Sequence, residues 1–276
     1  MAPGWLTAVA WTYLSVCFAC AAGIAYDIAF NYRRQPMAVM NAVYPITALY
    51  LGPFALAFYW RWGRVAARTA VAPMSVHQRS PSEPAPAHGT GTILLAEDKG
   101  APHGPGPGIP ARAAAADAPP RPGERARPRW VMMATEVSHC GSGCSLGDVI
   151  SEFAIFWLGL SIAGVTLWAE YIGDYVLALA LGIVFQYFAI APMRGLGLRD
   201  GLKAATKADF ISLTAFEIGL FGWMAIMAFV LFPAPHQLTP SSAAFWFLMQ
   251  IGMIIGFASS WPANVWLVKR GIKVPM

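Results

Sequence analysis

The stretch HCGSGCSLGD, which runs from His139 to Asp148, stands directly before a long apolar segment. It brings an imidazole, two thiols and a carboxylate together, from His139, Cys140, Cys144 and Asp148. These are the soft and borderline ligands that copper(I) and zinc prefer in proteins. The glycines between them would let the backbone curl, so that both sulfurs point to one centre. The stretch therefore predicts a metal-binding turn at a helix entrance.

The same stretch also fits a purely structural interpretation. Ser145 and Asp148 have the S-x-x-D spacing of a helix start, and Asp148 would stabilise the helix N-terminus electrostatically. In that case Cys140 and Cys144 are incidental thiols. We favour metal or thiol chemistry, because structural cysteines seldom flank a histidine in a glycine-rich turn.

The composition is that of an integral membrane protein. Hydrophobic residues make up 57% of the chain and charged residues 12%, and the mean hydropathy is +0.51. A soluble domain of this length rarely has such a composition, so we expect a bilayer to replace much of the core. The net charge of +5 comes from basic residues beside helix ends, which predicts contact with lipid and no nucleic-acid partner.

We predict an all-α membrane protein with about six transmembrane helices in a two-plus-four arrangement. Each of the six segments is apolar over a length that crosses a hydrocarbon core of about 30 Å. The first is taken as a retained helix and not as a signal peptide, because no basic region precedes it. The segments are Trp5 to Phe30, Ala38 to Trp60, Val149 to Trp168, Tyr171 to Pro192, Phe210 to Phe232 and Ser242 to Val268.

Three regions follow from this pattern. Residues 1–64 form an N-terminal two-helix membrane hairpin. Residues 65–135 form a disordered cytoplasmic linker, because a segment so rich in Pro, Ala and Gly cannot bury enough apolar surface to fold. Residues 136–276 form a four-helix membrane domain with the HCGSGC turn at its entrance.

Basic residues set the expected orientation in a cell inner (plasma) membrane. They gather after the second segment, between the fourth and fifth segments, and at the C-terminus, at Arg61, Arg64, Arg68, Arg194, Arg199, Lys203, Lys207, Lys269, Arg270 and Lys273. Six spans then place both termini and the linker in the cytoplasm, and the link from Glu170 to Asp174 outside. Arg33 and Arg34 are an exception that this topology puts outside, where pairing with Asp27 would lower their cost.

Polar side chains on the later segments predict a vestibule behind the cysteine turn. Glu152 lies one turn beyond Asp148, and the others fall at similar depths by a rise of about 1.5 Å per residue. A carboxylate in hydrocarbon costs a few kcal/mol, so Glu217 should face a bundle interior or a cavity, or else be a neutral, hydrogen-bonded packing residue. The predicted vestibule residues are Glu152, Gln186, Glu217, Ser260 and Asn264.

Several classes of function lack their sequence signatures. The chain has no phosphate-binding loop, which argues against a nucleotide cofactor, and neither G-x-S-x-G nor H-E-x-x-H, which argues against hydrolases. No histidine falls within a predicted span, which argues against haem. An enzyme is therefore the less favoured class.

Four stretches together resemble a bacterial integral-membrane family catalogued as domain of unknown function 4396. They are His139 to Asp148, Met37 to Tyr50, Lys207 to Leu213 and Ser260 to Lys273. The resemblance covers nearly everything except the linker. It implies a multi-helix membrane domain without an established reaction, and relatives are sometimes labelled as copper-associated, which is an association only.

The leading hypothesis is a membrane protein that binds or moves a soft transition metal such as copper(I) at its cytoplasmic face, through His139, Cys140 and Cys144, with Asp148 as a further ligand. Its partners would be the lipid bilayer and a metal ion or metallochaperone. A second hypothesis is a membrane redox enzyme in which Cys140 and Cys144 cycle and His139 is the base. A third is a non-catalytic assembly protein whose cysteine turn docks a partner.

Overall fold

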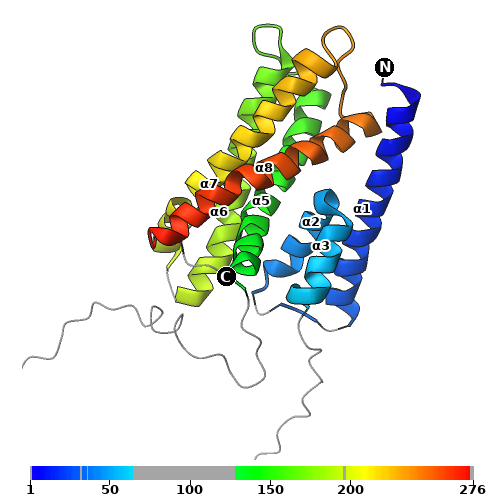
Figure 1. Cartoon of the computed structure of the whole chain (residues 1–276). Helices are drawn as coiled ribbons and strands as arrows, with labels where there is room; N and C mark the ends of the chain where they lie inside the picture. Colours follow the sequence, from blue (N-terminus) through cyan, green and yellow to red (C-terminus); the bar gives the residue numbers. More distant parts are fainter. Residues whose placement is uncertain (1, 32, 36, 65–127, 195–196, 274–276) are drawn as a thin grey trace, which may run out of the picture. The chain divides into compact units, whose positions relative to one another are not determined.

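The computed structural model describes residues 2–31, 33–35, 37–64, 128–194 and 197–273, and this part of the chain is helical. One compact unit contains all of it, and the second unit, residues 69–126, lies outside the described residues, as does most of the predicted linker. The helices are α1 (Gly4–Phe30), α2 (Met40–Leu51), α3 (Pro53–Phe58), α5 (Arg129–Leu158), α6 (Thr166–Arg194), α7 (Leu198–Ile226) and α8 (Ala243–Lys269) (Figure 1). Short π-helical turns, Tyr59–Gly63 and Met227–Leu231, follow α3 and α7.

Four helices are long and apolar enough to cross a membrane. They are Gly4–Phe30, Thr166–Phe188, Asp209–Leu231 and Ala243–Lys269. This confirms an all-helical chain with candidate membrane-spanning helices in the described residues, whereas the six predicted spans and their two-plus-four arrangement are not confirmed. Two predicted segments are interrupted: Ala38 to Trp60 breaks at Gly52, and Val149 to Trp168 includes the end of α5 at Leu158 and the start of α6 at Thr166.

The predicted second span is a re-entrant pair of short helices. Gly52 adopts a positive φ of 53°, which favours glycine, and Pro53 begins α3 directly after it, so α2 cannot continue. The chain returns to where it started: the Gln35 side chain donates to the Gly63 carbonyl at 3.0 Å. The segment therefore enters and leaves the bundle at the same end.

The tip of this re-entrant pair is held by side chains from two other helices. The Tyr13 hydroxyl on α1 donates to the Tyr50 carbonyl at 2.7 Å, and the Gln250 amide on α8 donates to the Leu49 carbonyl at 2.6 Å. These carbonyls belong to the last turn of α2, where helical partners run out. A broken helix is thus stabilised inside the bundle by satisfying its free backbone groups.

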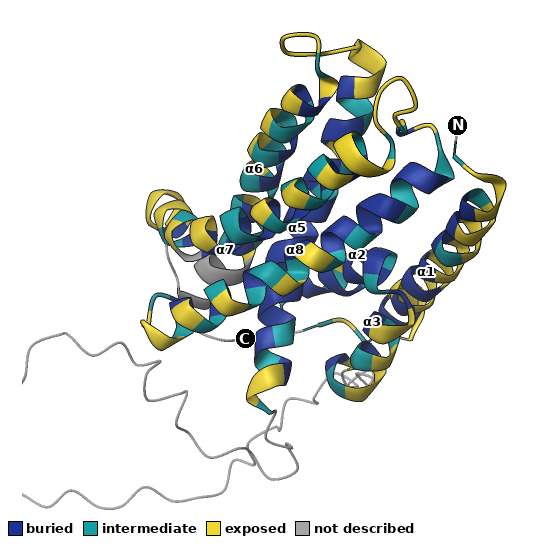
Figure 2. Ribbon diagram, turned by 45° about the horizontal axis from the view of Figure 1, so that its top comes forward, coloured by how far each residue is buried: buried dark blue, intermediate teal, exposed yellow. Residues whose placement is uncertain are grey.

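The predicted entrance turn is wrong, because HCGSGC lies in the middle of α5. The helix begins at Arg129, so residues 129–135, assigned to the linker, are helical, and Ser145 and Asp148 do not start a helix. From Val131 to Ile155 most of its residues are buried, and Figure 2 shows α5 in dark blue between its neighbours. It packs against α2, α6, α7 and α8.

The glycines of this stretch serve close helix packing. A Cβ on Gly143 would come within 2.7 Å of the Gly182 Cα on α6, and a Cβ on Gly147 within 2.5 Å of the Ala178 backbone nitrogen. Small residues at a spacing of four let two helix backbones approach closely in a membrane. The glycines therefore allow α5 and α6 to approach closely, and the backbone here is helical where a curled turn had been predicted.

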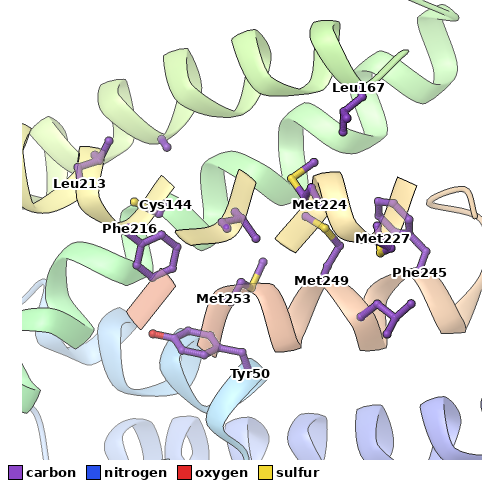
Figure 3. Packing of buried hydrophobic residues seen from close by; sticks show 13 residues of the cluster. Tyr50, Cys144, Leu167, Leu213, Phe216, Met224, Met227, Phe245, Met249 and Met253 are labelled. Atoms are coloured by element: carbon purple, nitrogen blue, oxygen red, sulfur yellow. The ribbon is translucent and has the colours of Figure 1, made fainter. Parts of the chain in front are cut away.

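An apolar cluster fills the space between α6, α7 and α8. Phe216, Met224, Met249 and Met253 are all at most 4% exposed and pack together there, with Cys144 of α5 in the same cluster (Figure 3). Sulfur side chains fill irregular gaps between helices well. This cluster encloses the polar face of α5 described below.

One end of the bundle, here called the basic end, is defined by Arg33, Arg64, Arg129 and Lys273. The rings of Phe58 and Trp130 lie 6.2 Å apart there, and Lys273 reaches Glu136 near the start of α5. The N-terminus of α1 lies at the other end (Figure 1). With the re-entrant pair in place, Arg33 and Arg64 lie at the same end of the bundle, where both contact Asp27. The side of the membrane on which each terminus lies stays a prediction.

Candidate functional site

Five titratable side chains line one face of α5, and we call them the α5 stripe. They are Glu136, Cys140, Cys144, Asp148 and Glu152, one at every fourth position, which places them on neighbouring turns of one face. Each is at most 1% exposed. At about 1.5 Å per residue, the stripe extends over roughly 24 Å. This length is comparable to the thickness of a hydrocarbon core, about 30 Å.

At the basic end the stripe meets the ammonium group of Lys273. This Nζ lies 2.9 Å from Glu136 Oε1 and 3.4 Å from Asp209 Oδ1. It also donates to Cys140 Sγ at 2.8 Å and to Asn264 Oδ1 at 3.0 Å. We call these four residues with Lys273 the Lys273 cluster. A buried ammonium is stable only with such partners.

The partners of Lys273 are themselves held in place. Cys140 Sγ donates to Asp209 Oδ1 at 2.6 Å, and Asn264 Nδ2 donates to Ser212 Oγ at 2.6 Å and to the Ser260 carbonyl at 3.0 Å. Because these bonds use the amide NH₂ of Asn264, its carbonyl oxygen must face Lys273.

The charge state of Lys273 follows from two opposing effects. Burial acts to lower its pKa, whereas Cys140, Glu136 and Asp209 act to raise it, and the net pKa lies well above the usual value. The ammonium is therefore protonated at neutral pH and balances one of the two carboxylates beside it.

Further along α5, four buried carboxylates form what we call the carboxylate cluster. Asp148 and Glu152 come from α5, Asp174 from α6 and Glu217 from α7, and each is at most 1% exposed. Asp148 interacts electrostatically with the other three, and Glu152 also with Glu170. Their polar neighbours include one another, Ser151 and Cys144. Carboxylates so placed cannot all be ionised, so the cluster must hold protons.

Cys144 connects the two clusters. It lies one turn from Cys140 on one side and one turn from Asp148 on the other, and it interacts with Glu217 of α7. Its side chain is fully buried. The stripe is therefore continuous from Lys273 to Glu152.

His139 lies off the α5 stripe and faces α6. Its ring centroid lies 6.3 Å from that of Phe185, and Gln186 is close by. Both imidazole nitrogens and the Gln186 side-chain oxygen have no hydrogen-bond partner in the described part of the chain. This pair forms a second polar position beside the Lys273 cluster, whose charges act on His139.

The four predicted metal ligands do not converge. His139 faces α6, Cys140 contacts Asp209 and Lys273, and Cys144 lies beside Glu217. Consecutive helical residues point about 100° apart, so His139 and Cys140 cannot share the centre that a curled turn would have formed. Within the described ranges, no group of three or more His, Cys, Asp or Glu side chains could hold a metal ion. Copper or zinc binding stays a prediction.

The predicted vestibule residues are all in the bundle, but not at one depth. Asn264 and Ser260 belong to the basic end, Gln186 lies beside His139, and Glu217 lies beside Cys144. Glu152 lies near the other end of α5, next to Asp174, and shares the carboxylate cluster with Glu217. The difference arises because α5 begins at Arg129, so that Glu152 is close to its other end.

Four members of the site were missed in the sequence. Glu136 had been assigned to the start of the membrane domain without a role, Asp174 to a loop, and Lys273 to the topology signal. Asp209 had been noted only within a family motif. The spacing of these residues could have revealed them. Titratable residues occur at every fourth position from Glu136 to Glu152, and polar or small residues do so on α6, at Glu170, Asp174, Ala178, Gly182 and Gln186.

The comparisons with known proteins agree with the boundaries of this site. The family model described as Domain of unknown function (DUF4396) matches residues 129–273, which begins at the first residue of α5 and ends at Lys273. The resemblance expected for Met37 to Tyr50 lies outside that match. No curated protein and no solved structure matches the chain. Because the model covers more than half of the 276 residues, the chain belongs to the family Domain of unknown function (DUF4396).

Proposed function

We propose that the bundle α5–α8 carries protons across the membrane along the α5 stripe. The observation that carries this proposal is the row of five buried titratable side chains, from Glu136 to Glu152, on one face of a central helix. Ionisable groups within a membrane protein are costly and commonly mark proton relays and ion pathways. A purely structural helix would have no need of them at every turn.

The partners of the stripe support proton transfer. Cys140 Sγ–H donates to Asp209, so a thiol proton is already shared with a carboxylate at the basic end. Cys144 stands next to Glu217, and the carboxylate cluster beyond it must hold protons. A proton moving between these groups stays inside the protein, since all of them are buried. Side-chain motions would bring together neighbouring members of the stripe, which lie one helical turn apart.

The orientation that fits this proposal places the basic end on the cytoplasmic side of a plasma membrane. Arg33 and Arg64 contact Asp27 at that end, Arg129 begins α5 beside Trp130, whose ring contacts that of Trp62, and Lys269 ends α8 one turn before Lys273. Cytoplasmic segments carry an excess of Lys and Arg. The N-terminus of α1 would then face the other side of the membrane.

A second proposal is the binding of a soft metal such as copper(I). The supporting feature is that Cys140 and Cys144 lie one turn apart on the same face of α5, as two thiolates of a two-coordinate copper(I) site would. The Lys273 ammonium, 2.8 Å from Cys140, works against a second cation there. Proton transfer is therefore the better-supported function.

The test measures proton flux in liposomes that contain the full chain. A potassium gradient with valinomycin drives protons, and an internal pH dye reports them. We expect flux with the wild-type protein, and loss of most of it in Asp148→Asn and in Glu217→Gln, because an amide cannot take up a proton from its neighbours. Asp200→Asn, at an exposed position on α7, is the matched control and should conduct like the wild type. Absence of wild-type flux, or full flux in both variants, would overturn the proposal.

A further inference from the structure

The Lys273 cluster has the geometry of a binding site for an ammonium ion. Two carboxylates, an amide oxygen and a sulfur surround the Nζ atom at 2.8–3.4 Å, and all four come from helices that precede Lys273 in the chain. These acceptors sit on α5, α7 and α8 and are at most 1% exposed. The site is therefore built by the bundle, and Lys273 only inserts its side chain into it.

Lys273 is attached to the bundle by a turn and not by a helix. After α8 ends at Lys269, Gly271 adopts a φ of 68°, and Ile272 N donates to the Leu267 carbonyl at 3.1 Å. This is the usual glycine turn that ends a helix. A reversal of the chain at Gly271 directs Lys273 inward, so a change in this turn alone would withdraw the ammonium group.

The Lys273 cluster lies at the basic end of the α5 stripe. Lys273 contacts both Glu136 and Cys140, the first two members of the α5 stripe, at the basic end. Its side chain is 1% exposed, and the sulfur of Cys140 is buried beneath it. The lysine therefore covers the end of the stripe that faces the basic side.

We propose that Glu136, Cys140, Asp209 and Asn264 form a site for a primary ammonium ion, that Lys273 occupies it as a tethered ligand, and that withdrawal of Lys273 opens the stripe to water. The part that concerns proton passage rests on the proposed function. The chemical class of the ligand follows from the four acceptors, which match a group that donates several hydrogen bonds and carries one positive charge.

The test measures the reactivity of Cys140 in the full chain after Cys17, Cys20 and Cys144 have been changed to Ala. A cationic methanethiosulfonate reagent is added at the basic end. With Lys273 present we expect slow labelling, and with Lys273→Ala labelling faster by about tenfold or more, because Cys140 becomes exposed to the reagent and the positive charge that repels the cationic reagent is lost. Methylammonium should slow labelling again in Lys273→Ala by filling the site, and an anionic reagent should react less.

Two variants make this test specific. Lys269→Ala, at an exposed position on the same helix end, removes a positive charge without touching the cluster and should leave labelling slow. Because Lys273→Ala leaves two carboxylates without their cation, Lys273→Ala combined with Glu136→Gln restores the charge balance and should also label fast. The proposal is overturned if both Lys273 variants label as slowly as the protein with Lys273, or if methylammonium has no effect on their labelling.

This outcome is separable from the proton measurement. Labelling of Cys140 requires no proton flux, so fast labelling without flux in any variant would contradict the proposed function and leave the ammonium site standing. Flux in the wild type together with unchanged labelling would contradict the ammonium site alone. If both are right, Lys273→Ala should also conduct protons several-fold faster than the wild type.

Discussion

Asp27 and Arg64 are joined by two hydrogen bonds, from Arg64 Nη2 to Oδ1 at 2.7 Å and from Nε to Oδ2 at 3.0 Å. Asp27 belongs to α1, and Arg64 follows the re-entrant pair. The same carboxylate accepts from Tyr59 at 2.9 Å and lies 3.7 Å from Arg33. Arg33, which precedes the re-entrant pair, and Arg64, which follows it, therefore both contact the same carboxylate.

Asp27→Asn should destabilise the protein. The amide keeps the shape but loses the charge that strengthens the Arg64 and Tyr59 bonds, and hydrogen bonds to charged groups contribute about 1.5–3 kcal/mol each. Thermal unfolding in detergent should occur at a clearly lower temperature than for the wild type. Asp200→Asn, exposed on α7, serves as the control. Equal melting temperatures for the two variants would contradict a structural role for Asp27.

Cysteine labelling from each side of the membrane should distinguish a re-entrant pair from a single crossing. In a cysteine-free background, Arg34→Cys and Arg61→Cys should react with a membrane-impermeant reagent from the same side, since both flank the pair at the basic end. Pro3→Cys should react from the other side. Labelling of positions 34 and 61 from opposite sides would mean that the segment crosses the membrane.

Gly147→Ala should destabilise the contact of α5 with α6. The added methyl group would lie 2.5 Å from the Ala178 nitrogen, which forces the helices apart, and overpacking of this kind costs about 1–3 kcal/mol. Gly222→Ala is the matched control, because no atom lies within 4 Å of its Cβ position in helix α7. That variant should be neutral or more stable by about 0.5–1 kcal/mol. Unfolding in detergent measures both, and a Gly147 variant as stable as Gly222→Ala would refute close packing there.

Elemental analysis of the purified protein tests the soft-metal prediction. If Cys140 and Cys144 bind copper(I) or zinc, the wild type should retain metal near one equivalent, and Cys140→Ser with Cys144→Ser should lose it. Cys17→Ser with Cys20→Ser is the control, since these thiols lie on α1, away from the stripe. A wild-type protein that holds no more metal than the double variant at 140 and 144 would end the metal hypothesis.

Parts of this organisation could be predicted and parts could not. The apolar helices α1, α6, α7 and α8 were predicted because a bilayer selects for long apolar segments, which local composition reveals. The central helix α5 was misread as a turn, since Gly143 and Gly147 weaken isolated helices. Only the close approach of Gly182 and Ala178 explains why those glycines are helical.

The candidate site, too, was predicted from the sequence only in part. Sequence reasoning singled out Cys140, Cys144, Asp148 and Glu217 from their chemistry, but assigned the first three to a metal turn. It did not find Lys273 as their neighbour, because this contact joins the C-terminal turn to the start of α5.

By itself, the sequence determined that the chain is helical and rich in membrane-type apolar segments, and it pointed to some of the buried titratable residues, such as Asp148 and Glu217, because these properties depend on composition and on spacing along one segment. The tertiary structure decided that Ala38 to Trp60 turns back at Gly52, that HCGSGC is the buried centre of α5, and that Lys273 covers the α5 stripe. Those features depend on contacts between distant segments, whose partners satisfy buried polar groups that no local pattern can pair.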